Sequence, residues 1–219
     1  GVLLLLSDST YAEVPGYTPS EKIVGETLEK VIGDSHGRVI IATFASLIAR
    51  IQQILDAAVK YKRKVSFVGK SMKDNVKLGL REGYLQAPNG LIVSTEEIRH
   101  VGPSEAVIVT TGSQGEPTSA LTRIAKNEHK ELTIIEGDTV VISATPIPGN
   151  ETVVSKNINN LLKLGAKVLH DKIALVHVHG HASQEELKMV LNVTKPKYFV
   201  PIHGEYRHLK AHADIACSL

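Results

Sequence analysis

The 219-residue sequence contains one cysteine, Cys217, no tryptophan, and only 4% aromatic residues. A single cysteine excludes an internal disulfide and a metal site built from several thiolates, and it is typical of a reducing compartment such as the cytoplasm. So few aromatic side chains argue against a surface that stacks many unpaired bases. The opening apolar run, residues 1–6, has no basic flank and is too short to cross a bilayer, so we expect neither a targeting segment nor a membrane partner.

Composition otherwise indicates an ordinary folded protein. Hydrophobic residues make up 42% of the chain and charged residues 22%, values that do not fit a disordered or collagen-like protein. The length allows one large domain or two small ones. The net charge of +2 does not by itself indicate a partner.

Short apolar runs alternate with helical patterns along the whole chain, which predicts an α/β fold with a largely parallel sheet and flanking helices. The expected strands are residues 2–6, 38–44, 65–68, 106–111, 132–135, 140–144, 173–179 and 198–203. The expected helices are residues 19–33, 46–61, 118–126 and 152–164, with others beginning near Ser71, Ser183 and Tyr206.

Local signals support several of these elements. Thr18, Ser71 and Ser183 are interpreted as helix caps, each with an acidic residue three positions later. The first strand, residues 2–6, is continuously apolar, which is typical of a strand covered on both faces.

Histidine is concentrated near the end of the chain, where seven of the ten histidines follow position 169. In a regular strand over residues 173–179, His177 and His179 share one face and His181 lies just beyond it. Imidazole clusters bind zinc, so these three histidines are candidates for a metal site. The alternative is that they are ordinary core or turn histidines.

Three chemically active side chains follow expected strands. Asp8, His181 and His203 each lie just after the carboxyl end of an expected strand, here called a strand exit, where ligands bind in α/β folds. Gly204 permits a sharp turn beside His203. Each of them alone could equally be part of an ordinary turn or cap.

Other strand exits suit anions, because small residues and hydroxyls precede a helix there. These exits contain Gly112 and Ser113, Ser46, and the residues 180–183, which include Gly180 and Ser183. The first of them could also hold a nucleotide cofactor in a small-molecule enzyme, although it matches no standard nucleotide-binding motif.

A basic window covers residues 60–81, with eight basic residues and one acid. Lys62, Arg63 and Lys64 form its densest part. The window is either a track for RNA phosphates or a solvated face.

Six ordered sequence strings resemble the ribonuclease J family, whose members combine a metallo-β-lactamase fold with a β-CASP insertion. The strings are LLSDST at 5–10, PGYTPSE at 15–21, ATFAS at 42–46, TGSQGEP at 111–117, GHASQEEL at 180–187 and KPKYFVPIHGEYR at 195–207. In the wider β-CASP group Asp8 matches motif A, His181 matches motif B and His203 matches motif C.

The resemblance implies zinc-dependent hydrolysis of RNA phosphodiesters, both 5′ to 3′ exonucleolytic and endonucleolytic, in RNA processing and decay. It implies that His203 binds one of two zinc ions and that His181, supported by Asp8, assists proton transfer or stabilises the scissile phosphate. It also implies RNA contacts from the loop that contains Ser46, Leu47 and Ile48, and from the segment that contains His177, Val178, His179, Gly180 and His181.

The family's His-x-His-x-Asp-His metal signature is absent from these residues. By resemblance, residues 1–15 and 169–219 are parts of a metallo-β-lactamase domain, and residues 16–168 form the β-CASP domain. We therefore expect a fragment that is inactive alone and that lacks an N-terminal partner segment, with the complete protein a homo-oligomer. The alternative is an RNA-binding or assembly module without catalysis of its own.

Overall fold

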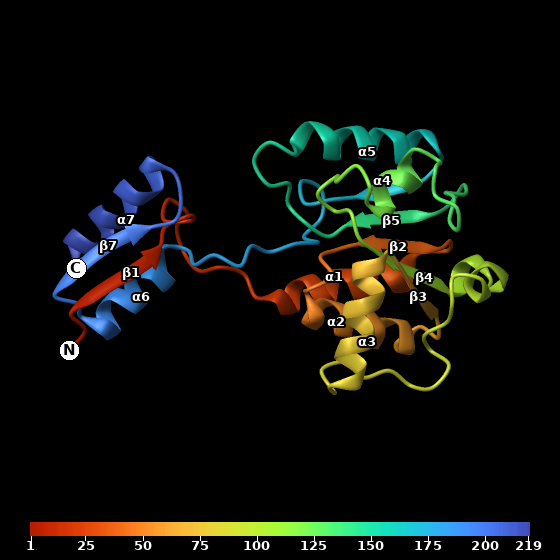
Figure 1. Ribbon diagram of the computed structural model, residues 1–219, viewed down its shortest axis with the longest axis horizontal. Coiled ribbons are helices and arrows are strands. Elements are labelled where there is room, and N and C mark those ends of the chain that lie inside the picture. The colour runs from red at the N-terminus through yellow and green to blue at the C-terminus, as the bar shows by residue number, and fades with distance from the viewer. The chain divides into compact units, whose positions relative to one another are not determined.

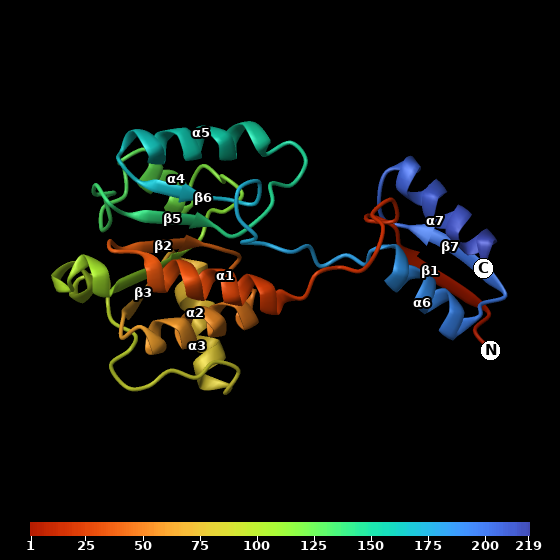
Figure 2. The same ribbon diagram turned by 180° about the vertical axis from the view of Figure 1, so that it is seen from behind.

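The computed structural model describes residues 1–219, which divide into two compact units. Unit 1 consists of Gly1–Ser20 and Val178–Leu219, and unit 2 consists of Glu21–His177. The chain therefore crosses between the units twice, as Figures 1 and 2 show. Every strand pair is parallel and helices flank the sheets, so the predicted α/β class is confirmed.

Unit 2 is built on a five-stranded sheet in the order β3-β4-β2-β5-β6. Its strands are β2 (Val39–Ala42), β3 (Lys64–Val68), β4 (Ala106–Thr110), β5 (Thr139–Ile142) and β6 (Lys167–Leu169). Its helices are α1 (Glu21–Asp34), α2 (Ile48–Lys60), α3 (Lys70–Arg81), α4 (Ala120–Ala125) and α5 (Glu151–Lys163), with short 3-10 helices at Glu97–His100 and Pro103–Glu105. In both views α1, α2 and α3 cover one face of the sheet, and α4 and α5 cover the other (Figures 1 and 2).

The apolar patterns explain this arrangement. Every residue of β2, β4 and β5 is buried, as expected for β-branched runs in a sheet covered on both faces. Helix α1 buries Val24, Leu28 and Ile32, which recur every four residues and form one stripe.

Unit 1 contains a two-stranded sheet with two helices, α6 (Gln184–Thr194) and α7 (Tyr206–Ser218). Strand β1 (Leu4–Asp8) pairs with β7 (Tyr198–Ile202), and Asp8 lies opposite Ile202. Burial alternates along both strands, and Leu4 and Leu6 are 46% and 56% exposed. The expectation that this first strand is covered on both faces is wrong. One face of the two-stranded sheet is partly buried, and the other, which carries Leu4 and Leu6, is exposed.

Two expected strands are absent. Residues 173–179 have no regular structure; they lead out of unit 2, and the chain crosses to unit 1 after His177. Residues 132–135 pack apolar side chains on the core without joining the sheet, because both edges of the following strand β5 are occupied by β2 and β6. Strand β6 was not expected.

Two expected caps are also wrong, whereas the third is confirmed. Helix α3 begins at Lys70 with Gly69 as its N-cap, so Ser71 lies inside the helix. Thr18 bonds to Ser183 and Glu186 at the start of α6, not to α1. Ser183 and Glu186 form the capping box that the sequence predicts for α6. None of the helices is both long and apolar enough to cross a membrane.

Candidate functional site

Asp8, His181 and His203 converge in unit 1. Asp8 is the last residue of β1 and His203 follows β7, so the parallel pairing brings both to one sheet edge. His181 lies in the loop before α6, with its Nδ1 2.9 Å from Asp8 Oδ2. His203 Nε2 lies 3.9 Å from the same oxygen, and one donor atom from each of the three residues lies within 4.8 Å of the others. The three strand-exit candidates of the sequence therefore form one cluster.

The cluster holds an ionised carboxylate. Burial raises the pKa of Asp8, but hydrogen bonds from Thr10 and His181 outweigh burial and leave this pKa below its ordinary value. A carboxylate only accepts, so His181 Nδ1 carries the proton of that bond, and Nε2 remains as the second reactive atom of the ring.

Three further side chains hold the loop of His181. Tyr11 stacks on the ring of His179 with centroids 3.6 Å apart. Thr18 Oγ1 donates to a carboxylate oxygen of Glu186 at 2.6 Å and lies 3.0 Å from the carbonyl oxygen of His181. The hydrogen bond from Thr18 is the largest cause that lowers the pKa of Glu186. Sequence patterns missed Tyr11 and the role of Thr18, because both contacts join segments more than 160 residues apart.

His203 occupies a strained turn. Its φ is +55°, a left-handed conformation that is uncommon outside glycine, and Gly204 follows at φ +138°. The turn ends in a capping box at α7, where Glu205 N–H donates to His208 Nδ1 at 3.1 Å. Strain of this kind is retained where the surrounding structure fixes it, which is frequent at functional sites.

The expected cluster of His177, His179 and His181 does not form the convergent group. His177 Nδ1 accepts a hydrogen bond from Arg50 at 3.1 Å, because arginine can only donate. His179 Nδ1 donates to the carbonyl of His181 at 2.8 Å. The three residues whose donor atoms do converge are instead Asp8, His181 and His203.

The remaining anion candidates lie in unit 2, where β2 and β4 end side by side. Ser46, Leu47 and Ile48 lead into α2, whose N-cap Leu47 provides no side-chain bond. Gly112 and Ser113 follow β4, and Ser113 is buried. The helices that follow these two strands cover opposite faces (Figure 1), so the loops flank a topological switch point, where α/β sheets bind ligands.

Some basic side chains of the window bond to backbone carbonyls, and others are exposed to solvent. Arg63 is 4% exposed and donates to the carbonyls of Gly37 and Ser35, so it does not face solvent. Lys64 donates to the carbonyl of Gly90 at 2.6 Å. Lys62 is exposed, lies two residues before the start of β3, and has a φ of +55°.

A further basic surface lies where α3 begins. Lys70 and Lys73 line a cavity of about 380 Å³ together with Arg123 and Lys130. None of these four forms an ion pair with Asp74 or Glu131, the two acids of that cavity.

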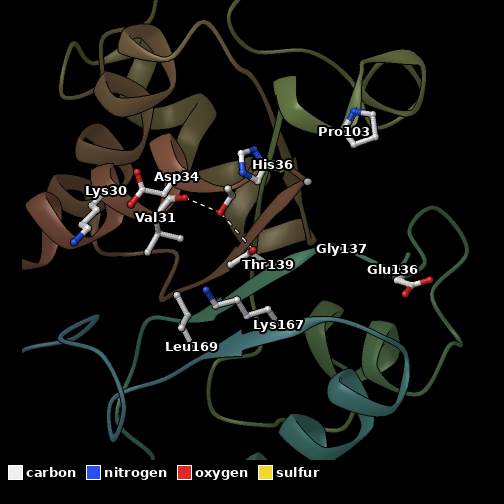
Figure 3. A pocket seen from close by; sticks show the side chains of 12 residues that line it. Lys30, Val31, Asp34, His36, Pro103, Glu136, Gly137, Thr139, Lys167 and Leu169 are labelled. Carbon is white, nitrogen blue, oxygen red and sulfur yellow. Dashed lines mark hydrogen bonds between the residues drawn. The ribbon is translucent and has the colours of Figure 1, made fainter.

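Figure 3 shows another cavity, of about 740 Å³, where β2, β5 and β6 begin. Lys30 and Lys167 are balanced by Asp34 and Glu136 around it, and none of the predicted site residues lines it. Its charges therefore indicate no particular ligand.

Comparisons with known proteins agree with the sequence strings. Residues 36–161 match the family model "Ribonuclease J, beta-CASP domain", and residues 166–216 match "Zn-dependent metallo-hydrolase RNA specificity domain". The chain is 48% identical to Ribonuclease J 1 of Streptococcus pyogenes over 219 residues, 100% of the chain and 39% of that protein. It is 50% identical to Ribonuclease J2 of Bacillus subtilis over 99% of the chain and 39% of that protein, and 50% identical to Ribonuclease J of Thermus thermophilus over 95% and 36%. The chain thus spans less than two fifths of the length of these relatives.

Proposed function

Because this chain belongs to the ribonuclease J family, we propose that it is part of a metal-dependent ribonuclease that hydrolyses RNA phosphodiesters. The observation that carries the proposal is the convergence of Asp8, His181 and His203 within 4.8 Å. The proposal includes 5′ to 3′ exonucleolytic and endonucleolytic cleavage in rRNA processing and mRNA decay.

The donor set suits zinc. A carboxylate oxygen and two imidazole nitrogens are common zinc ligands, and the lowered pKa of Asp8 keeps its carboxylate ionised near neutral pH. In the proposal His203 is a ligand to one of two ions, which when bound supply Lewis-acid activation of water and phosphate. Two tetrahedral sites need more donors than this cluster contains, and only His203 is proposed as a ligand, so this chain alone is proposed to be inactive.

The residues of the cluster have separate tasks. Asp8 fixes the ring of His181 through Nδ1, which leaves Nε2 to take up a proton and, once protonated, to donate it to the leaving oxygen or to bond the scissile phosphate. Thr18 and Tyr11 limit the movement of the His181 loop. A preoriented imidazole of this kind loses little entropy when the substrate binds.

RNA contacts are proposed on both units. The small and hydroxyl residues beside Ser46 and Gly112, and the residues from His177 to Ser183, supply N–H and O–H donors for phosphates. The open cations at the start of α3 supply sequence-independent attraction.

The proposed domains keep the residue ranges predicted above, whose two boundaries lie five and nine residues before those of the compact units. Unit 1 would be part of the metallo-β-lactamase domain and unit 2 the β-CASP domain. The relatives are longer than this chain, and the exposed face of β1 and β7 is apolar, so we propose that further polypeptide covers this face. The complete protein is proposed to be a cytoplasmic homo-oligomer.

The test uses the full-length protein with Asp8→Ala, His181→Ala and His203→Ala, and with His100→Ala, outside the cluster, as the matched control. Loss of a catalytic acid–base group costs about 10²–10⁴-fold in rate, so each cluster variant should cleave labelled RNA at least 100-fold more slowly. The control should retain the wild-type rate. Wild-type cleavage by all three cluster variants would refute the assignment.

A second candidate function is RNA binding or assembly without catalysis by this chain. The observation that favours it is the incomplete donor set of the cluster. Zinc content and RNA cleavage measured on the purified 219-residue chain separate the two possibilities. Stoichiometric zinc together with cleavage by this chain excludes the second candidate.

A further inference from the structure

Helix α7 contains a buried histidine, His212, that lies next to the turn after Asp8. His212 is completely buried, and its ring packs edge-on against Phe199 with centroids 4.7 Å apart. Its Nδ1 lies 3.0 Å from Ser9 Oγ, and Ser9 is likewise completely buried. Ser9 directly follows Asp8, so His212 is one residue removed from the cluster without belonging to it.

The surroundings determine which nitrogen of His212 carries the proton. Burial lowers the pKa of His212 more than the charge of Asp8 raises it, so the ring is neutral and has one N–H. Nε2 is buried and has no hydrogen-bond partner. An unpaired buried N–H is rarer than an unpaired acceptor, so we assign the proton to Nδ1, which then donates to Ser9 Oγ. The hydroxyl of Ser9 then donates to the carbonyl of Ser7, 3.3 Å away.

Ser9 also bonds the turn of His203. Its backbone N–H donates to the carbonyl of His203 at 3.1 Å, which extends the β1–β7 pairing by one residue. That carbonyl belongs to the strained residue at φ +55°. Because α7 begins at Tyr206, three residues after His203, the helix that carries His212 also fixes the far side of this turn.

These contacts connect the two turns on both sides, and we call the set the Ser9 circuit. Ser9 follows Asp8 in the chain and is hydrogen-bonded to both His203 and His212. Helix α7 joins the turn of His203 to His212. We propose that His212 is a positioning residue, which holds the Asp8 turn against the His203 turn through its bond to Ser9. The inference rests on the proposed function, because it assigns the Ser9 circuit to the geometry of that cluster. His212 itself does not contact the reacting atoms.

The first test reads the hydrogen bond directly. Long-range ¹H–¹⁵N NMR of the 219-residue chain should show His212 as a neutral ring protonated at Nδ1 above pH 6.5, the ordinary pKa of histidine, and Ser9→Ala should shift its Nδ1 resonance. A ring protonated at Nε2, or a spectrum unchanged by Ser9→Ala, overturns the inference whether or not the protein cleaves RNA.

The second test measures RNA cleavage by the full-length protein. His212→Phe and Ser9→Ala should each lower kcat by about 10–100-fold, the usual effect of residues that orient a metal site, and leave KM within about twofold. His212→Asn keeps a donor near the position of Nδ1 and should recover most of kcat. Ser66→Ala is the matched control, because Ser66 is buried in unit 2 and its hydroxyl has no partner.

Coupling between the two positions separates positioning from simple destabilisation. Residues that act through one hydrogen bond are not additive, so the double variant should lose no more kcat than His212→Phe alone. Additive losses, or wild-type kcat in Ser9→Ala, would overturn the inference. Should His212→Phe fail to fold, Ser9→Ala and His212→Asn still decide the result. Failure of the wild-type protein to cleave RNA refutes the proposed function instead, while the NMR result stands by itself.

Discussion

Arg50 places a guanidinium group inside unit 2, where it is 1% exposed. Its Nε and Nη2 donate to the two carboxylate oxygens of Glu21 at 2.6 and 2.7 Å. Its Nη1 donates to the carbonyl of Ser143 at 2.8 Å and to His177 Nδ1 at 3.1 Å. Glu21 is the first residue of unit 2 and His177 the last, so one side chain ties down both ends of the unit.

Replacement of Arg50 by Met should therefore destabilise unit 2. Breaking a buried ion pair from one side costs about 3–5 kcal/mol, and the partial exposure of Glu21 places the expected loss at about 3 kcal/mol. Urea unfolding, followed by a probe in β4, measures this free energy. Arg123→Met is the control, since Arg123 has only a long bond to the Glu128 carbonyl. Equal urea midpoints for the two variants would contradict the role of Arg50.

The carboxylate of Asp8 gives a residue-scale prediction about pH. Its folded-state pKa is lowered, so its stabilising bonds are fully present above the unfolded value near 3.8 and are lost as the pH falls through the folded value. The carboxyl ¹³C resonance should titrate below 3.8, and in His181→Ala it should move upward. An Asp8 resonance that titrates above 3.8 in the wild-type chain would contradict this prediction.

At the scale of elements, α3 carries the open part of the basic window. Lys70 and Lys73 lie on this helix without ion pairs, whereas the preceding strand β3 is flanked by the buried Arg63. Replacing Lys62, Arg63 and Lys64 together would therefore not test RNA binding alone, because Arg63 donates to two backbone carbonyls inside unit 2 and its loss would also destabilise the fold.

Reversal of Lys62, Lys70 and Lys73 to Glu should weaken RNA binding for all sequences alike. Fewer counterions are released per complex, so the slope of log K against log salt should become shallower by about one for each phosphate that is no longer neutralised. Fluorescence anisotropy of the full-length His181→Ala protein, at several salt concentrations, measures both quantities. Reversal of Lys22, Lys156 and Lys163 is the control; an equal loss of affinity there would indicate general charge attraction.

At the scale of the whole chain, the two units differ in how much of their sheets they bury. The central strands of unit 2 are buried on both faces, whereas β1 and β7 expose alternate apolar residues. A two-stranded sheet is marginally stable without further cover. The unit that contains the candidate site is thus the less enclosed of the two.

Hydrogen exchange should reveal this difference. In the 219-residue chain, amides of β1 and β7 should exchange at least 100-fold faster than those of β2 and β4, because local opening costs less there. In the full-length protein, protection of β1 and β7 should rise if further polypeptide covers their open face. Equal protection of both sheets in the isolated chain would show that unit 1 needs no such cover.

Elements with strong local signals can be predicted from the sequence alone. The buried runs of β2, β4 and β5 and the capping box of Ser183 and Glu186 depend on neighbouring residues, and the sequence strings by themselves grouped Asp8, His181 and His203. The alternating pattern at residues 173–179 was misleading, because a strand forms only where a sheet edge accepts it. Three contacts depend on the folded structure: Thr18 bonds at the start of α6, Arg63 bonds inside unit 2, and His212 bonds to Ser9. Each of these contacts joins segments distant in sequence, and a side chain's partner there is set by packing rather than by any local pattern.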